Sequence, residues 1–359
     1  AAEVLVGGAR HLAKVPPVQA ERVPWGEDFA ATVESLARFR GLRVVVLASG
    51  DPMNYGAGTI VAKRFARDEF AVLPAPSAFS LAAARLGWAL PDVECLTVHG
   101  RPLAVVDRLV APGRRLLVLA EDGETPSQLA AHLVRRGYGH SPITALERLG
   151  GANERILEGT AESWAHSSCD DLVTLAVECV AGESARILSR AAGLPDEAFA
   201  HDGQITKREV RAATLARLMP LPGQLLWDVG AGAGSIAVEW LRAEPSARAV
   251  ALERDPARLR LIHRNAEILG VPELKIVAGE APRALSELPA PPDAVFVGGG
   301  IAAETLRFCW RALGPRGRLV ANAVTLEAER ALLDFHAVAG GELTRIAVER
   351  VEPLGAHAA

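Results

Sequence analysis

One short stretch constrains the fold of this chain more than any other: an apolar run that ends in an acid and in alternating glycines. Residues 225–235 read LLWDVGAGAGS, and the sequence that follows is compatible with a helix. A strand, a glycine turn and a helix bring backbone N–H groups and the positive end of a helix to a point that a ligand can approach closely. The stretch therefore predicts an α/β unit with a nucleotide-like ligand on the turn.

The spacing of the glycines leaves two ligand classes open. Gly230, Gly232 and Gly234 follow G-x-G-x-G, whereas dinucleotide folds prefer G-x-G-x-x-G. Glu253 closes the next predicted strand, where its carboxylate can accept hydrogen bonds from two ribose hydroxyls. Because NAD and S-adenosylmethionine sites share such an acid, these residues alone do not choose between the two ligands.

Two later segments are expected at the same sheet edge. Residues 275–281 (KIVAGEA) place Gly279, Glu280 and Ala281 where an adenine would lie, and residues 293–300 (DAVFVGGG) end a strand in three glycines. Ligands bind outside the carboxyl ends of the strands in open parallel sheets. Any one glycine could merely serve a turn, but four features in this order favour a single ligand site.

The second half alternates strand and helix patterns throughout. Thr206 and Glu209 form a T-x-x-E sequence that predicts a capping box at the start of a helix, although the Thr206 hydroxyl could also face a ligand. Segments separated in this way predict a parallel sheet. The expected helices are 206–219, 235–243, 256–269 and 302–313, and the expected strands are 224–229, 247–252, 274–278, 293–297 and 317–323.

The first half shows a similar alternation with a different glycine loop. Residues 42–48 (LRVVVLA) predict a strand covered on both faces, and the loop 48–58 (ASGDPMNYGAG) follows it directly. A second parallel sheet is expected here. The other expected strands are 70–73, 115–120 and 172–180, and the expected helices are 58–67, 80–86 and one that starts at Thr125-Pro126.

Length and composition bound the possibilities further. A chain of 359 residues predicts two domains, and a net charge of −4 argues against a nucleic-acid protein that binds through a positive field. The four cysteines form no C-x-x-C pair, so neither a zinc site nor a disulfide framework is expected, and no metal site is expected elsewhere. The sequence has no apolar run of membrane-spanning length and no signal-peptide pattern, which predicts a cytoplasmic protein without membrane contact.

Residues 201–323 resemble a known family. The segment ITKREVRA (205–212), the glycine loop, GEAP (279–282) and VGGG (297–300) are similar to the CbiT-type precorrin C15-methyltransferase/decarboxylases, which are class I, Rossmann-like S-adenosylmethionine enzymes. This resemblance favours S-adenosylmethionine over NAD. The residues that it implies for donor binding are Thr206, Gly230, Ala231, Gly232, Ala233, Gly234, Glu253, Gly279, Glu280 and Ala281.

The first half resembles another family over residues 3–180. The loop 48–58, together with residues 73–87, HGRP (99–102) and LAEDGETP (119–126), is similar to the CbiE-type tetrapyrrole (class III) methyltransferases. Members of that family usually begin with a further strand ahead of a segment like residues 4–12, so this strand is expected to be missing here. The implied donor-binding residues are Ser49, Gly50, Asp51, Met53, Ser77 and Ala78.

Joined in this order, the halves resemble the CobL-type decarboxylating precorrin C5,15-methyltransferases of cobalamin biosynthesis. The expected domains are 1–181 and 201–359, with a linker at 182–200. The resemblance implies methylation of precorrin-6B at C15 by the second domain and at C5 by the first. It also implies decarboxylation of the ring C (C12) acetate, which gives precorrin-8X. A methyltransferase acting on RNA or another small molecule, a dehydrogenase, and a non-catalytic tetrapyrrole- or donor-binding scaffold remain alternatives.

Methyl transfer from S-adenosylmethionine requires few catalytic side chains. Because a sulfonium methyl is already activated, the enzyme mainly aligns it with a ring carbon and excludes water. His201 and Lys207 are the candidates for acid–base work, and Lys207, Arg208, Arg211 and Arg101 are candidates for binding the substrate carboxylates, with His99 a weaker one. Each could equally belong to a solvated helix face or loop. The family also implies a homo-oligomer, with a tetramer formed through the C-terminal domain as one form.

Overall fold

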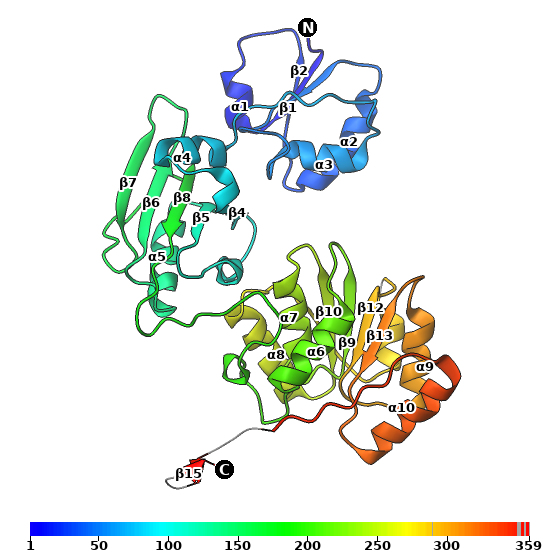
Figure 1. Cartoon of the computed structure of the whole chain (residues 1–359). Helices are drawn as coiled ribbons and strands as arrows, with labels where there is room; N and C mark the ends of the chain where they lie inside the picture. Colours follow the sequence, from blue (N-terminus) through cyan, green and yellow to red (C-terminus); the bar gives the residue numbers. More distant parts are fainter. Residues whose placement is uncertain (289, 350–352, 355–356, 359) are drawn as a thin grey trace. The chain divides into compact units, whose positions relative to one another are not determined.

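The computed structural model describes residues 1–288, 290–349, 353–354 and 357–358. It divides into two compact units: residues 1–101 with 112–185, and residues 102–111 with 186–359 (Figure 1). Within the described residues no helix combines the length and the apolar character that crossing a bilayer requires.

The first unit begins with a small parallel sheet in the order β2-β1-β3. The central strand β1 (Val4–Gly7) is buried along its whole length, between β2 (Glu21–Pro24) and β3 (Val44–Val46). A core of buried and half-buried apolar side chains from β1, β3 and the segment Leu36–Phe39 fills the space beneath the sheet. The helices of this part are α1 (Ala9–Lys14), α2 (Phe29–Ser35) and α3 (Ala57–Arg64).

Two expectations for this part of the chain are wrong. The strand predicted over 42–48 is shorter, Val44–Val46, and is only half-buried rather than covered on both faces. Residues 70–73, all of which the structure describes, form no strand, and Leu73 is 84% exposed. An apolar run becomes a strand only where a neighbouring strand takes up its backbone hydrogen bonds, and 70–73 pairs with none of the described strands.

The other sheet of the first unit is mixed. Its order is β4-β5-β8-β6-β7, and only β4 and β5 are parallel. The prediction of a parallel sheet in this half is therefore wrong for these strands, because β6 and β7 form an antiparallel hairpin with no helix between them. The bounds are β4 (Val93–Thr97), β5 (Arg115–Leu119), β6 (Pro142–Glu147), β7 (Arg155–Thr160), β8 (Val173–Glu178), α4 (Ala78–Leu86) and α5 (Thr125–Arg135).

The second unit contains a five-stranded parallel sheet in the order β11-β10-β9-β12-β13. The order reverses between β9 and β12, which is the switch point where such sheets bind ligands. The strands are β9 (Leu225–Val229), β10 (Arg248–Glu253), β11 (Lys275–Ala278), β12 (Ala294–Val297) and β13 (Arg318–Ala321). The helices are α6 (Arg208–Leu218), α7 (Ser235–Ala243), α8 (Pro256–Ile268), α9 (Ala303–Ala312) and α10 (Leu326–Ala339).

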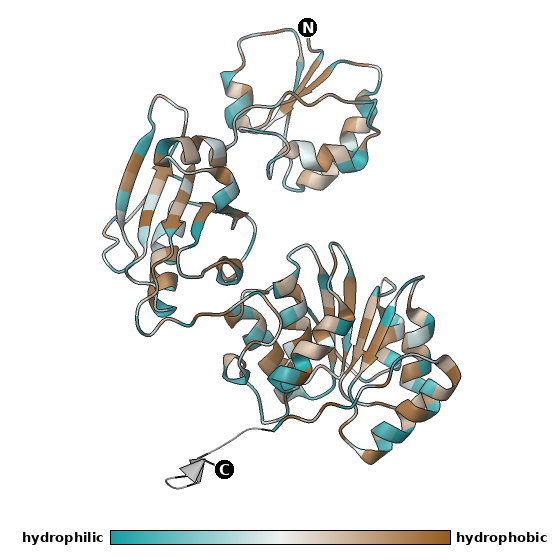
Figure 2. Cartoon of the chain, in the orientation of Figure 1, coloured by the Kyte–Doolittle hydropathy of each residue, from teal (hydrophilic) through white to brown (hydrophobic). Residues whose placement is uncertain are grey.

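Helices cover both faces of this sheet. Alternate residues of β9 and β12 point to opposite faces, so Leu226 and Phe296 join one apolar cluster whereas Trp227 and Val295 join another. The first cluster is closed by α6, α7 and α8, and the second by α9 and α10. Figure 2 shows the apolar colouring concentrated on these central strands. The Rossmann-like α/β fold predicted for this half is confirmed.

Candidate functional site

The two outer glycines of the loop after β9 are required by close packing. Gly230 and Gly234 have φ angles of +67° and +74°, a region that glycine adopts without steric cost. A Cβ atom on Gly230 would lie 2.7 Å from the Gly299 backbone, and one on Gly234 would lie 2.9 Å from Ile262 Cγ2. The first contact joins the loops after β9 and β12, which brings the turn to the switch point of the sheet.

The middle glycine instead leaves open space. Gly232 has a φ of +60°, and a Cβ atom there would meet only the Gln204 carbonyl oxygen, at 3.7 Å. Its N–H donates to Glu253 Oε2 at 2.8 Å. The loop thus presents a cradle that a side chain would fill and that a ligand can occupy.

Glu253 is held rigidly at the carboxyl end of β10. Its side chain is buried, and Oε1 accepts hydrogen bonds from the N–H groups of Arg254 and Asp255 at 2.8 and 2.9 Å. Together with Gly232, three backbone donors fix the carboxylate; Oε1 accepts two of these hydrogen bonds and Oε2 accepts one, so Oε2 keeps a lone pair for a further donor. A carboxylate held in this way beside the loop can accept hydrogen bonds from ribose hydroxyls.

Asp228 is a second acid beneath the same loop. Its Oδ2 accepts a hydrogen bond from the Ala237 N–H in α7, and its Oδ1 is buried without a partner among the described residues. Burial raises the pKa of this carboxyl to about 7, and the negative charge of Glu253 adds to the shift. The orphaned oxygen identifies a polar group close to the glycine loop that the described residues leave unsatisfied.

The segment GEAP lies next to Glu253, as predicted for one wall of the site. The Gly279 N–H donates to the Glu253 carbonyl at 3.0 Å, which fixes the turn after β11 beside the end of β10. Glu280 points outward, since its carboxylate pairs with Arg254 at 2.7 Å and both side chains are more than 70% exposed. The turn therefore offers its backbone, rather than the Glu280 carboxylate, to a ligand.

The predicted capping box before α6 is wrong. The helix begins at Arg208 with Lys207 as the N-cap, and no side chain among the described residues caps it. The Thr206 carbonyl accepts a hydrogen bond from the Arg211 guanidinium instead. The Thr206 hydroxyl is thus not committed to the helix end and stays a donor-site candidate.

The expectation that Arg211 binds substrate is corrected by its position. The side chain is fully buried, and Nε donates to Glu239 Oε1 at 2.6 Å while Nη1 contacts Asp196 Oδ1 at 3.1 Å. Nη2 donates to the Leu194 carbonyl. A guanidinium with these partners cannot reach a ligand in solvent, so Arg211 anchors the segment before α6.

The other candidates near α6 are accessible. Lys207 is exposed, with its Nζ 4.0 Å from Asp196 Oδ2, and Arg208 is exposed on the first turn. His201 is exposed, and its Nδ1 accepts a hydrogen bond from the Gly203 N–H at 3.0 Å. All three can meet a ligand, and their proposed roles remain predictions.

In the first unit, the two predicted donor segments lie side by side. Gly50 has a φ of +55°, and a Cβ atom there would lie 3.3 Å from the Pro76 carbonyl oxygen, next to Ser77 and Ala78. The Ser77 hydroxyl caps α4 by accepting from the Ser80 N–H at 3.1 Å. The structure therefore brings 49–53 and 77–78 together, although they are more than twenty residues apart in sequence.

The remaining first-unit candidates are held by local contacts. The Asp51 carboxylate accepts from the Met53 N–H at 2.8 Å, and Ser49 Oγ is hydrogen-bonded to His11 Nε2 at 2.8 Å. The Arg101 guanidinium lies over the Tyr55 ring at 5.8 Å, and the His99 imidazole is 3.4 Å from the carboxylate of Glu121. Arg101 and His99 are both exposed.

Comparison with known proteins places the chain in a family. Residues 2–165 match the tetrapyrrole (corrin/porphyrin) methylases, and residues 197–359 match the precorrin methyltransferase domain. A precorrin-6Y C(5,15)-methyltransferase [decarboxylating] from Sinorhizobium sp is 48% identical over 99% of this chain and 86% of that protein. The chain belongs to the decarboxylating precorrin-6Y C(5,15)-methyltransferases.

Each half of this family member also has separate relatives. A cobalt-precorrin-7 C(5)-methyltransferase of Salmonella typhimurium is 36% identical over 43% of this chain and 76% of that protein. A probable cobalt-precorrin-6B C(15)-methyltransferase (decarboxylating) of Pyrobaculum calidifontis is 38% identical over 46% of this chain and 88% of that protein. The family resemblance inferred from the sequence motifs is confirmed.

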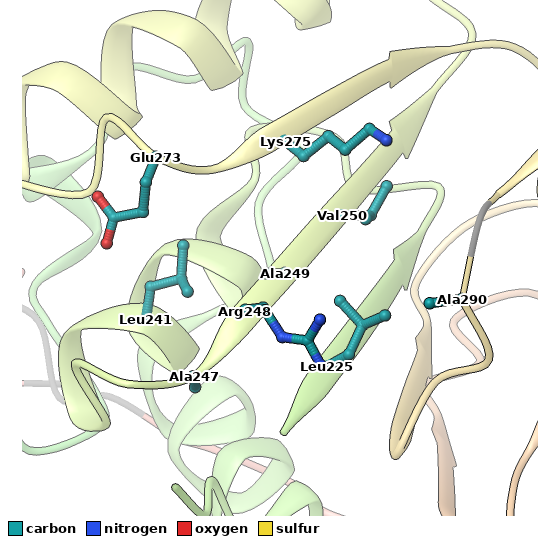
Figure 3. A pocket seen from close by; sticks show the side chains of 9 residues that line it. All are labelled: Leu225, Leu241, Ala247, Arg248, Ala249, Val250, Glu273, Lys275 and Ala290. Atoms are coloured by element: carbon teal, nitrogen blue, oxygen red, sulfur yellow. The ribbon is translucent and has the colours of Figure 1, made fainter. Parts of the chain in front are cut away.

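A cavity of about 290 Å³ lies at the amino ends of the strands of the same sheet (Figure 3). It is lined by the first residues of three strands, Leu225 of β9, Arg248 of β10 and Lys275 of β11. The glycine loop follows the carboxyl end of β9, whereas this cavity lies where the strands begin. It is therefore not the donor site.

Sequence reasoning missed two residues of the site. It described Asp228 only as the acid that ends an apolar run, although an acid directly before a glycine turn was a usable signal. It assigned no role to Asn265, which is fully buried and hydrogen-bonded to the glycine loop through the Ala233 carbonyl. A lone asparagine in a charged helix gives no sequence signal of burial.

Proposed function

We propose that this chain methylates precorrin-6B at C15 and C5 and removes the carboxyl group of the ring C (C12) acetate, giving precorrin-8X. S-adenosylmethionine is the methyl donor. The observation that carries the proposal is a fixed Glu253 beside an open glycine cradle, in a chain that shares its whole length with the decarboxylating C(5,15)-methyltransferases.

The residues of the second unit fit this donor. Gly232 leaves space in the turn, Glu253 Oε2 offers its remaining lone pair to a ribose hydroxyl, and Asp228 Oδ1 offers a buried polar group beneath the loop. The proposed donor residues of this domain are Thr206, Gly230, Ala231, Gly232, Ala233, Gly234, Glu253, Gly279, Glu280 and Ala281. Those of the first domain are Ser49, Gly50, Asp51, Met53, Ser77 and Ala78.

The chain's own groups act by binding and alignment. When bound, S-adenosylmethionine supplies a methyl group that is already activated for transfer. The protein orients the donor through the loop and Glu253, and it binds the carboxylate-fringed tetrapyrrole through Lys207, Arg208 and Arg101. His201 and Lys207 are the proposed proton carriers.

The two methylations are assigned to separate domains. The relatives of the first half are named as C5 enzymes and those of the second half as C15 decarboxylating enzymes, which supports C5 methylation by 1–181 and C15 methylation with decarboxylation by 201–359. Residues 182–200 are the proposed linker. Its last residues, which include Leu194 and Phe199, pack into the core of the second unit.

A homo-oligomer, with a tetramer as the expected form, is proposed to assemble through the C-terminal domain. Helix α10 has no buried residue, and Leu326 and Val338 on it are 81% and 90% exposed. Large apolar side chains exposed on one helix are candidates for such a contact surface. Sedimentation velocity of the full chain should show an oligomer that Val338→Glu dissociates, and a monomeric wild type would contradict this.

The expected cytoplasmic location stays a prediction, and neither nucleic acid nor membrane is a proposed partner.

The assignment of the two activities can be tested in the full chain. Glu253→Ala should abolish decarboxylation and C15 methylation of precorrin-6B, because the ribose loses its acceptor. The same variant should still methylate C5 when it receives the decarboxylated, C15-methylated intermediate. Loss of C5 methylation in a folded Glu253→Ala protein would overturn the division of labour.

A further inference from the structure

One face of α8 contacts both the glycine loop and the segment that precedes α6. Arg258, Ile262 and Asn265 are spaced i, i+4 and i+7, which places them on one side of the helix. Ile262 lies under Gly234, as shown by the 2.9 Å approach to its Cβ position. The two polar residues on either side of Ile262 reach a different segment, residues 200–207, which we call the strap.

Asn265 joins the strap to the loop. Its Oδ1 accepts from the Ala200 N–H at 2.7 Å, and its Nδ2 donates to the Ala200 and Ala233 carbonyls at 2.9 and 2.8 Å. The side chain is fully buried, so these bonds are made away from solvent. One amide therefore ties the backbone of the strap to the backbone of the donor loop.

Arg258 holds the middle of the strap. Its Nε donates to Asp202 Oδ2 at 2.9 Å and its Nη2 to Gln204 Oε1 at 2.6 Å. The guanidinium side chain is 24% exposed, so the contact lies at the surface rather than in the core. The Gln204 carbonyl is the group nearest the open space at Gly232, at 3.7 Å from the Cβ position. The width of the cradle thus depends on where Arg258 keeps Gln204.

The far end of the strap is anchored independently. The Thr206 carbonyl accepts a hydrogen bond from the buried Arg211, which is itself paired with Glu239 and Asp196. The strap is therefore fixed at its start by Asn265, at its middle by Arg258 and at its end by Arg211. Only the middle contact can be removed without opening a buried polar network.

We propose that Arg258 and Asn265 are positioning residues that hold the strap against the glycine loop and thereby set the affinity of the second domain for its methyl donor. The inference rests on the proposed function, because the donor is S-adenosylmethionine in both. The strap is the outer wall of the donor site, and α8 fixes that wall and the loop together. A binding site depends on supporting contacts that hold its walls in place.

The main test replaces Arg258 in the full chain. Arg258→Met should raise the donor KM for C15 methylation about 10-fold and leave kcat at saturating donor within about twofold, as expected when the ground state and the transition state lose the same binding free energy. Arg258→Lys should recover part of the affinity. The matched control is Arg217→Met, which removes another surface guanidinium with two short contacts to one carboxylate, and it should change neither value.

A double-mutant cycle separates positioning from a general loss of stability. Asp202→Asn, which removes the charge from the contact with Arg258, should raise the donor KM in the wild-type background but have little further effect in Arg258→Met, where that contact is already lost. Asn265→Asp, which retains an acceptor for the Ala200 N–H but cannot donate to the two carbonyls, should raise the donor KM more than Arg258→Met. If that variant does not fold, the Arg258 series decides.

The outcomes distinguish the inference from the proposed function. Wild-type protein that binds no S-adenosylmethionine in calorimetry would overturn the proposed function. Wild-type protein that binds it, with an unchanged donor KM in Arg258→Met, would overturn the inference alone. A loss of kcat without a change of donor KM would also overturn it.

Discussion

Replacing Gly232 by aspartate tests the donor loop directly. A Cβ atom at Gly232 meets only the Gln204 carbonyl at 3.7 Å, so the fold has room for a side chain. The φ of +60° costs a non-glycine residue about 1 kcal/mol, and Asp and Asn tolerate that region best. The variant should therefore fold, with a loss of stability from the backbone and from repulsion by Glu253.

The charge should abolish donor binding at this site. The Gly232 nitrogen is 2.8 Å from Glu253 Oε2, which would place the introduced carboxylate close to that acid. The same carboxylate would repel the donor's own carboxylate; two carboxylates roughly 5 Å apart repel by about 3 kcal/mol at an effective dielectric constant of 20, which corresponds to about 100-fold in donor affinity. The repulsion from Glu253 acts with or without donor, so it lowers stability rather than affinity.

Gly232→Asn is the matched control because it has the same shape without the charge. Calorimetry with S-adenosylmethionine should show the second-domain site intact but weakened in Gly232→Asn and lost in Gly232→Asp. The number of donor molecules bound per chain should then fall by one. Equal, wild-type-like binding by both variants would show that the loop does not hold the donor.

Two further predictions concern buried charges. Arg211→Met should lower the free energy of unfolding by about 3–5 kcal/mol in denaturant titration, because it leaves Glu239 buried without its partner; a loss below about 1 kcal/mol would contradict the buried pair. Asp228 has its folded pKa raised to about 7, so the folded state binds its proton more tightly and this group's contribution to stability falls as the pH rises from about 4 to about 7. Asp228→Asn should flatten that part of the stability–pH curve, and an unchanged slope would refute the raised pKa.

The second domain could be predicted closely from sequence because its local signals agree. Each strand from β9 to β13 is an apolar run bounded by turn residues, and each predicted helix starts within two residues of its observed position. Of the α-helices described in this domain, α10 was not predicted, and no element was expected after residue 323. In such folds the alternation of strands and helices along the sequence predicts the parallel sheet.

The first domain was less predictable because its sheets depend on partners distant in sequence. The strands β6 and β7 pair in an antiparallel hairpin, whereas residues 70–73 have a similar apolar character and pair with no described strand. A run of apolar residues does not reveal whether a neighbour exists. The prediction of a parallel sheet from alternating strands and helices therefore failed where antiparallel strands follow each other directly.

The residues of the candidate site also differ in how far the sequence could predict them. The glycine loop and Glu253 were predictable because their chemistry is local to one strand–turn–helix unit and its neighbouring strand. Arg211 was misassigned because an arginine on a polar helix reads as exposed until its partner Glu239, 28 residues away, is placed beside it. Asn265 was missed for the same reason, since its partners are backbone groups of other segments.

The central claim is tested most directly by the product formed from precorrin-6B and methyl-labelled S-adenosylmethionine. Mass spectrometry of the full reaction with the whole chain should show a tetrapyrrole that has gained two labelled methyl groups and lost one molecule of carbon dioxide. An unmodified tetrapyrrole, or a methylated product that retains every carboxyl group, would contradict the account.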